Sequence, residues 1–232
     1  MNLRAVRSFV RRAGRQTDAQ QRALVELWPR YGVPGETGLI DFAVLFGRSA
    51  PNTIEIGFGN GDHLAARALA EPERNFLGVE VHRPGIGHLL RIAAAANLAN
   101  LKVIEQDAVE LLHSRIAPDS LDEVQILFPD PWPKKRHHKR RLIQPEFAML
   151  VASRLRRGGR LHLATDWEPY AQQMRAVLDD CPLLATVTDE HLPARAATRF
   201  EQRGLRLGHG VSDLIYARTD AAHQTKIVTN NA

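Results

Sequence analysis

The fold of this 232-residue chain is decided by residues 52–61, which read Asn52-Thr53-Ile54-Glu55-Ile56-Gly57-Phe58-Gly59-Asn60-Gly61. The first half is β-branched and apolar, as in a buried strand, and the second half places a glycine at every other position. Residues 62–70 then follow with helical character. A strand that turns through glycines into a helix begins a doubly wound α/β sheet, and ligands bind at this turn.

Outward from this unit, strand-like and helix-like segments alternate along the chain. This alternation predicts a parallel sheet with helices on both faces. After Cys181 two strand-like segments follow with no helix between them, which predicts a hairpin. The expected fold is an α/β, doubly wound, mostly parallel seven-stranded Rossmann-like sheet with an antiparallel C-terminal edge hairpin. The expected strands are 52–58, 75–81, 101–106, 121–128, 160–164, 184–187 and 214–217, and the expected helices are 62–70, 84–98, 108–115, 144–157 and 168–179.

Composition and length favour one globular domain with short extensions. Hydrophobic residues make up 44% of the chain, and its single cysteine, Cys181, excludes an internal disulfide, which fits a cytoplasmic protein. No apolar run approaches the roughly 20 residues of a membrane span, so no membrane partner is expected. We expect a basic N-terminal arm over residues 1–35, the sheet domain over 36–220 and a tail over 221–232.

The positive charge lies in two short segments. The net charge is +5, residues 1–15 contribute +5, and residues 134–141 contribute +6, which leaves −6 for the rest of the chain. An acidic body with basic patches is typical of a protein that binds a polyanion such as RNA on one surface. The alternative, a solvated charge run that aids solubility, stays open for the N-terminal segment. There Arg4, Arg7, Arg11 and Arg15 recur at helical spacing.

The glycine spacing indicates which nucleotide cofactor would bind. A dinucleotide site needs G-x-G-x-x-G, with pyrophosphate at the helix start, whereas here Asp62 takes the place of the last glycine. An aspartate at that position would repel pyrophosphate. S-adenosylmethionine carries no phosphate and has a positive sulfonium, which tolerates neighbouring carboxylates such as Glu55. The pattern therefore favours adenosylmethionine, with S-adenosylhomocysteine as product and no metal.

Acidic residues follow the next strands as well. Glu80 ends the second strand, where a carboxylate can accept hydrogen bonds from both ribose hydroxyls, and Asp107 follows the third strand, within reach of adenine. Each acid alone is better explained as a helix cap or a loop residue. Together, beside a glycine-rich loop, they favour a cofactor site formed by Glu55, Gly57, Gly59, Gly61, Glu80 and Asp107.

The fourth strand ends in Phe128-Pro129-Asp130-Pro131-Trp132-Pro133-Lys134. The prolines end the strand and fix Asp130 at the carboxyl edge, beside the glycine loop. Trp132 offers a flat face on which an extruded base could stack. The alternative is a rigid turn capped by an aspartate. The basic run that follows would contact phosphates, and its two histidines have no partners at metal-ligand spacing.

The sequence resembles the bacterial tRNA guanine-N7 methyltransferases, which are class I adenosylmethionine-dependent enzymes. The segments that carry the resemblance are 7–12, 55–61, 78–82, 128–134, 136–141, 164–170 and 198–210. The resemblance implies methylation of guanosine 46 in the variable region of tRNA, with Asp130 both as the catalytic residue and as a further residue of the cofactor site. It implies that guanosine is held by Lys134, Asp166, Thr198, Arg199, Phe200 and Glu201. It implies that tRNA is contacted by Arg136, His137, His138, Lys139, Arg140 and Arg141.

Guanine N7 has a free lone pair and no proton, so methyl transfer to it needs no general base. We therefore expect Asp130 and Asp166 to orient the base and to stabilise the charge that develops on it. Two other classes stay open from the sequence. A nicotinamide-dependent oxidoreductase would bind NAD, and a non-catalytic RNA-binding protein would bind RNA without transferring a methyl group. The oligomeric state, monomer or homodimer, stays open too.

Overall fold

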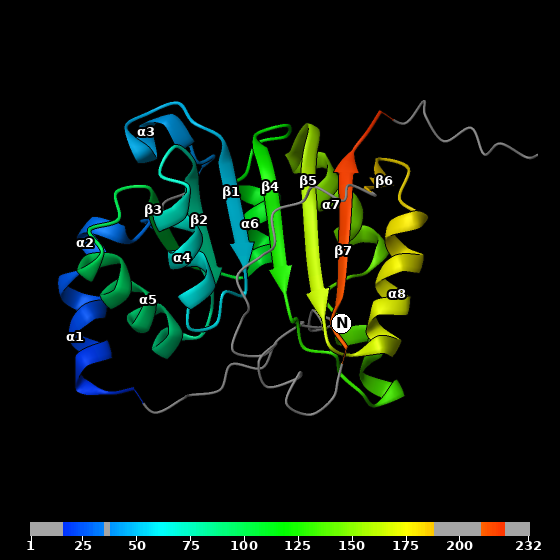
Figure 1. Ribbon diagram of the computed structural model, residues 1–232, viewed down its shortest axis with the longest axis horizontal. Coiled ribbons are helices and arrows are strands. Elements are labelled where there is room, and N and C mark those ends of the chain that lie inside the picture. Colours follow the sequence, from blue (N-terminus) through cyan, green and yellow to red (C-terminus); the bar gives the residue numbers. More distant parts are fainter. Residues whose placement is uncertain (1–15, 35–37, 188–209, 221–232) are drawn as a thin grey trace, which may run out of the picture.

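The computed structural model describes residues 16–34, 38–187 and 210–220. Its centre is a seven-stranded sheet in the order β3-β2-β1-β4-β5-β7-β6 (Figure 1). Five strands are parallel, whereas β7 is antiparallel to both β5 and β6. The predicted fold, with its antiparallel edge pair, is therefore confirmed. The strands are β1 (Asn52–Ile56), β2 (Asn75–Glu80), β3 (Leu101–Glu105), β4 (Leu121–Leu127), β5 (Leu155–Thr165), β6 (Leu184–Thr186) and β7 (Ser212–Arg218).

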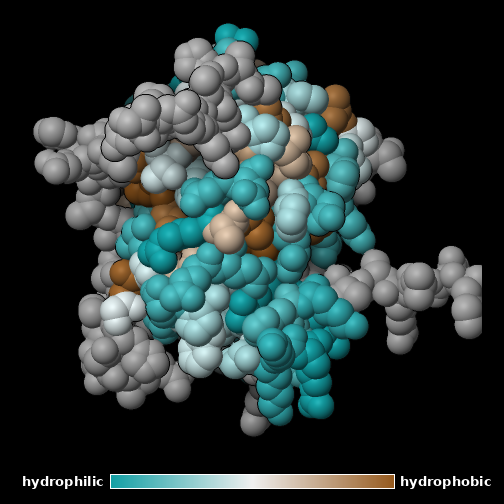
Figure 2. Space-filling view, turned by 90° about the vertical axis from the view of Figure 1, so that its right-hand side faces the viewer, coloured by the Kyte–Doolittle hydropathy of each residue, from teal (hydrophilic) through white to brown (hydrophobic). Residues whose placement is uncertain are grey.

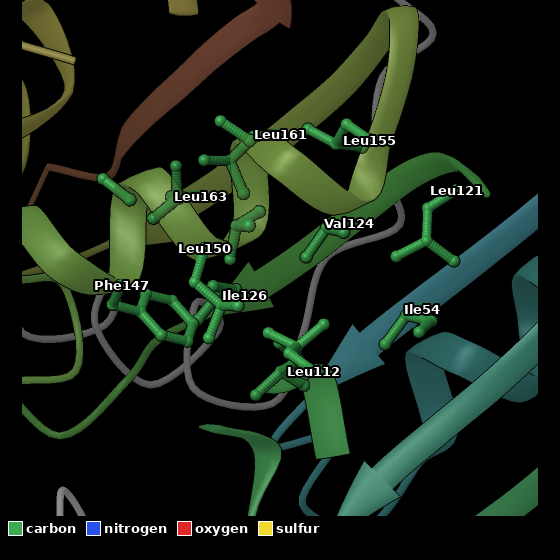
Figure 3. Close-up of a cluster of buried hydrophobic side chains, with 14 of the residues drawn as sticks. Ile54, Leu112, Leu121, Val124, Ile126, Phe147, Leu150, Leu155, Leu161 and Leu163 are labelled. Carbon is green, nitrogen blue, oxygen red and sulfur yellow. The ribbon is translucent and has the colours of Figure 1, made fainter. Parts of the chain in front are cut away.

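The helices form one layer on each face of the sheet. On one face α1, α4 and α5 enclose a core around Phe76 and Val103. On the other face α6, α7 and α8 enclose a larger core, part of which Figure 3 shows; it includes Ile54, Ile126 and Leu163 from three neighbouring strands and Phe147 from α7. The helices are α1 (Asp18–Glu26), α2 (Trp28–Tyr31), α3 (Phe42–Phe46), α4 (Asp62–Ala70), α5 (Arg83–Ala95), α6 (Ala108–Ser114), α7 (Pro145–Arg154) and α8 (Glu168–Asp179), with a 3-10 helix, η1 (Lys135–Arg140).

The predicted boundary between the fourth helix and the fifth strand is wrong. The sequence predicted a helix over 144–157 that stops at two glycines, but α7 ends at Arg154 and β5 begins at Leu155. Leu155 is buried, has extended dihedral angles and pairs with Leu121 of β4. Gly158 has a φ of +70°, which allows the chain to bend before Arg160 pairs with Glu123. The glycines therefore form a bend inside the strand, and tertiary pairing overrides the helical pattern.

Part of the N-terminal segment packs on the sheet domain. The hydroxyl of Tyr31, fully buried, donates to the carbonyl of Ala93 in α5 at 3.1 Å, and the Val33 amide donates to the carbonyl of Val103 in β3 at 2.8 Å. Residues 1–15, with the arginines predicted to share a helix face, lie outside the described residues. The division of the chain after residues 35 and 220 into an arm, a sheet domain and a tail stays a prediction.

Within the described ranges, every helix is too short or too polar to cross a bilayer.

Candidate functional site

The glycine-rich loop links β1 to α4 at the carboxyl edge of the sheet. Gly57, Gly59 and Gly61 have φ values of +71°, +59° and +79°, a left-handed region that side chains with a Cβ rarely adopt. The Gly57 amide donates to the carbonyl of Val79 in β2 at 2.8 Å. The alternating glycines therefore form a tight backbone wall that a ligand can approach closely.

Glu80, the last residue of β2, holds this loop. Its Oε2 accepts from the Gly59 amide at 2.9 Å, and its Oε1 accepts from the amides of Val81 and His82 at 2.7 and 3.0 Å. A carboxylate offers about four acceptor positions, so these three bonds leave room for a ligand hydroxyl. Glu80 thus fixes the loop and remains able to accept one more hydrogen bond.

A cavity of about 240 Å³ lies against this loop. Most of its lining is apolar, and its charged side chains in the described part of the chain are two carboxylates, Glu80 and Asp130. This volume is below the ~300–1,000 Å³ of most small-molecule pockets, so a bound cofactor would fill it and extend outward. The lining is formed by Ile56, Gly57, Gly59, Val79, Glu80, Val81, Gln106, Ala108, Val109, Ile126, Leu127, Phe128, Pro129, Asp130 and Leu142.

The cavity lining includes four of the residues that the sequence assigned to the cofactor: Gly57, Gly59, Glu80 and Asp130. The other three, Glu55, Gly61 and Asp107, are not part of this lining, and their role at the cofactor stays a prediction. Glu55 is buried, with its Oε2 3.0 Å from Nδ1 of His63, and Gly61 is the N-cap of α4. Asp107 caps α6 by accepting from the amides of Val109 and Glu110.

Sequence reasoning missed Gln106, which directly follows β3 and lines the cavity. The sequence signal for Gln106, its position directly after the third strand, was present but weak. Charge favoured Asp107 as the ligand contact, but the side chains of adjacent residues at the end of a strand point in opposite directions, so only one of the two residues can face the cavity. The structure brings Gln106 to the cavity and leaves Asp107 on the helix.

Asp130 follows β4 on a constrained backbone. It is exposed, and the residues two positions before and after it, Phe128 and Trp132, have φ values of +53° and +44°. Left-handed conformations of bulky residues cost roughly 1–3 kcal/mol each and persist only where the surrounding structure holds them. The Phe128 amide donates to the carbonyl of Ala164 in β5 at 2.7 Å, and Arg141 Nε donates to the Pro131 carbonyl at 2.8 Å.

Asp166 lies at the same edge of the sheet as Asp130. It directly follows β5 and is half-buried. Because Leu127 at the end of β4 pairs with Ala164, the segments that carry Asp130 and Asp166 leave the sheet side by side. Lys134 is exposed at the start of η1. The other predicted guanosine contacts, Thr198, Arg199, Phe200 and Glu201, lie outside the described residues.

The basic run forms η1, which is partly or fully exposed from Lys135 to Arg140. Its end contacts the indole of Trp132, since the Arg140 guanidinium lies 5.0 Å from the Trp132 ring and His137 meets that ring edge-on at 5.7 Å. The predicted stacking platform thus has a cation over one face. Partial desolvation, together with the cations of Arg136 and Arg140 and the two neighbouring lysines, lowers the pKa of His137. Figure 2 shows hydrophilic side chains gathered at the lower end of the molecule, the end to which the arrows of β4 and β5 point in Figure 1.

Arg141 is the exception in this run. The sequence placed it among the tRNA contacts, but its side chain turns inward and only 3% of the residue is exposed. It donates to Pro131 and Gln173 and stacks on Tyr170. In this structure its guanidinium is therefore out of reach of a phosphate on the surface.

Across the described ranges, no three His, Cys, Asp or Glu side chains are grouped so that they could hold a metal ion.

Comparisons with known proteins agree with this geometry. A family model described as a putative methyltransferase matches residues 49–214. A protein of Paraburkholderia xenovorans (strain LB400) named tRNA (guanine-N(7)-)-methyltransferase is 52% identical over 224 residues, covering 95% of this chain and 86% of that protein. One of the same name from Halorhodospira halophila (strain DSM 244 / SL1) is 55% identical over 228 residues, covering 94% and 98%. The solved structure of the 16S rRNA methyltransferase KamB aligns with a TM-score of 0.53 at 14% identity, over 90% of this chain and 97% of that one, a likeness of fold alone.

Proposed function

Since this chain belongs to the family of tRNA (guanine-N7)-methyltransferases, we propose that it transfers the methyl group of S-adenosylmethionine to N7 of guanosine 46 in tRNA. The observation that carries the proposal is the arrangement at the carboxyl edge of the sheet. An apolar cavity with two carboxylates opens beside an exposed segment of lysines, arginines and histidines. Because the proposed substrate is tRNA, we place the enzyme in the cytoplasm as part of the same proposal.

The cavity chemistry fits adenosylmethionine. The backbone wall of Gly57 and Gly59 admits a close ligand, Glu80 has acceptor capacity for a ribose hydroxyl, and Gln106 offers an amide for a base edge. The two carboxylates of the lining suit a cationic cofactor and disfavour a phosphate. When bound, the cofactor supplies an electrophilic methyl group on a positive sulfonium.

The side chains beyond the cavity suit guanine as acceptor. Asp130 lines the cavity, and Asp166 leaves the neighbouring strand at the same edge. Carboxylates there can accept from the N1–H and the exocyclic amine of guanine, which orients N7 without removing a proton. As the base becomes cationic, a negative side chain nearby stabilises the transition state more than the ground state.

The basic segment suits the phosphates around that nucleotide. Lys134, Lys135, Arg136 and Lys139 are exposed. Each cation that pairs with a phosphate releases counterions, so binding should weaken steeply with salt. Phosphate contacts place the tRNA, and the two carboxylates then select the base.

The test is a methyl-transfer assay with bulk tRNA and radiolabelled adenosylmethionine, followed by nucleoside analysis. We expect labelled 7-methylguanosine and no other labelled nucleoside. A matched pair of transcripts, with guanosine or adenosine at position 46, should differ in that only the first accepts label. Label in another nucleoside would refute the N7 assignment, and label in the adenosine transcript would refute position 46.

A further inference from the structure

Arg141 is the last cation of the basic run, yet it faces the interior. Its Nε donates to the Pro131 carbonyl at 2.8 Å, and its Nη1 donates to Oε1 of Gln173. Its guanidinium lies 4.8 Å from the ring centroid of Tyr170, which is fully buried. All these contacts are with other parts of the protein, which distinguishes Arg141 from the exposed cations before it.

These contacts join the two segments that carry the predicted guanine-binding carboxylates. Pro131 is the residue after Asp130 in the segment that follows β4. Tyr170 and Gln173 lie in the first turns of α8, which begins two residues after Asp166. The Tyr170 hydroxyl also accepts from the Ile143 amide at 3.2 Å, so the same ring supports the chain just after Arg141. One guanidinium thus connects the end of β4 to the start of α8.

The arrangement is costly for stability alone. A buried cation loses hydration, and its contacts here are two neutral acceptors and an aromatic ring. Among the described residues, Nη2 of Arg141 is buried without a hydrogen-bond partner. Desolvation correspondingly lowers the pKa of Arg141. Well-packed apolar residues in place of buried charges are often as stabilising or more so, so the guanidinium needs another explanation.

The backbone it supports supplies that explanation. Asp130 lies between two left-handed residues, Phe128 and Trp132, whose conformations need external support. The bond from Arg141 to the Pro131 carbonyl fixes the middle of this segment, on the side of Asp130 opposite to the bond between Phe128 and Ala164. We propose that Arg141 is a positioning residue that holds Asp130 and Asp166 in register for methyl transfer and makes no contact with tRNA. This inference rests on the proposed function.

The test compares Arg141→Gln with the wild-type protein by steady-state kinetics on tRNA. A misplacement of about 1 Å at a reacting centre can cost ~100-fold in rate, so we expect kcat to fall roughly 10- to 100-fold. The Kd for tRNA and the slope of log Kd against log salt should stay as in the wild type. Arg141→Lys can keep one bond to the Pro131 carbonyl but not the second bond to Gln173, so it should recover part of the loss.

Two control variants separate the alternatives. Lys139→Ala removes an exposed cation two residues away and should weaken tRNA binding and reduce the salt slope by about 1. Arg218→Gln removes a half-buried arginine that donates to the carbonyls of Ala152 and Leu155, at the opposite edge of the sheet. It should lower the unfolding temperature and leave kcat unchanged well below that temperature.

A second measurement does not depend on methyl transfer. Hydrogen exchange of peptides that include residues 126–134 should be faster in Arg141→Gln than in the wild type, because the Phe128 amide loses its fixed geometry. Lys139→Ala should show no such change. If Arg141→Gln does not fold, Gln173→Ala removes the α8 partner but keeps the bond from Arg141 to the Pro131 carbonyl, and it should show a smaller increase in exchange and a smaller loss of kcat.

Two results would overturn the inference. A reduced salt slope in Arg141→Gln with unchanged kcat would make Arg141 a tRNA contact. A lower unfolding temperature with unchanged kcat and unchanged exchange at 126–134 would make it merely structural. A wild-type protein that methylates no tRNA would refute the proposed function, and the exchange experiment would still decide whether Arg141 orders the Asp130 segment.

Discussion

Gly85 offers a sharp test of how the glycine-rich loop is positioned. It lies in the first turn of α5, and a Cβ added there would lie 1.9 Å from the carbonyl oxygen of Gly59 and 2.9 Å from its carbonyl carbon. Both atoms belong to the backbone, so no side-chain rotation relieves the contact. Gly85→Ala therefore forces the helix and the glycine-rich loop apart.

The size of the effect follows from these distances. Ordinary contact begins at 3.4 Å, so Gly59 or α5 must move by the difference from 1.9 Å, about 1.5 Å. Overpacking costs ~1–3 kcal/mol, and the bond from the Gly59 amide to Glu80, at 2.9 Å, contributes ~1.5–3 kcal/mol if it breaks. Alanine regains ~1 kcal/mol of helix propensity. We expect the free energy of unfolding to fall by roughly 1.5–5 kcal/mol and adenosylmethionine affinity to fall ~100-fold.

Gly87→Ala is the matched control, two residues further along the same helix. Its Cβ would lie 2.7 Å from the carbonyl oxygen of Gln20 in α1, on the side away from the loop. Urea unfolding and calorimetric titration with adenosylmethionine would compare the two variants. Both should be destabilised, but only Gly85→Ala should bind the cofactor weakly. A Gly85→Ala protein that is more stable than the wild type and binds normally would refute the reasoning.

Three further predictions concern ionisable groups of the site. Asp130→Asn should lower methyl transfer by ~100- to 1,000-fold, because the developing positive charge loses its carboxylate, with the unfolding temperature nearly unchanged at this exposed position; wild-type turnover would contradict the assignment. Glu80→Gln should weaken adenosylmethionine binding by roughly 10- to 100-fold in titrations, since an amide cannot replace a carboxylate that accepts three backbone hydrogen bonds, and unchanged affinity would count against a cofactor role. Because the pKa of His137 is lowered, its ring is neutral at pH 7. A phosphate contact favours the protonated ring, so the affinity for tRNA should increase as the pH falls from 7.5 to 5.5. His137→Gln should remove that increase, and an identical pH dependence in the variant would exclude His137 from the interface.

Local patterns in the sequence predicted the sheet well. The bounds of α4 and α8 agree with the predicted 62–70 and 168–179, because each helix has a clear start and an apolar face. The glycine-rich loop was predictable for the same reason, since alternating glycines after a strand have few structural explanations. Such features depend on neighbours in the chain and can be read without tertiary contacts.

The inward turn of Arg141 could not be predicted in this way. A run of cations looks like one solvated surface, and nothing within the run distinguishes its last member. Its burial depends on Tyr170 and Gln173, about 30 residues later, which provide a ring and an acceptor. The role predicted for Asp107 stays a prediction for a related reason, because the carboxylate that caps α6 can also be a ligand contact and the sequence does not distinguish the two.

The acidic lining of the cavity has a consequence for competition among metabolites. A cell contains many adenine nucleotides that share the adenosine moiety of the proposed cofactor but carry phosphates. A phosphate about 4 Å from the carboxylate of Glu80 or Asp130 would be repelled by ~1–4 kcal/mol per charge pair, depending on the local dielectric. Repulsion of this size keeps abundant anionic nucleotides from occupying the cavity, so discrimination depends as much on what the two carboxylates exclude as on what they bind.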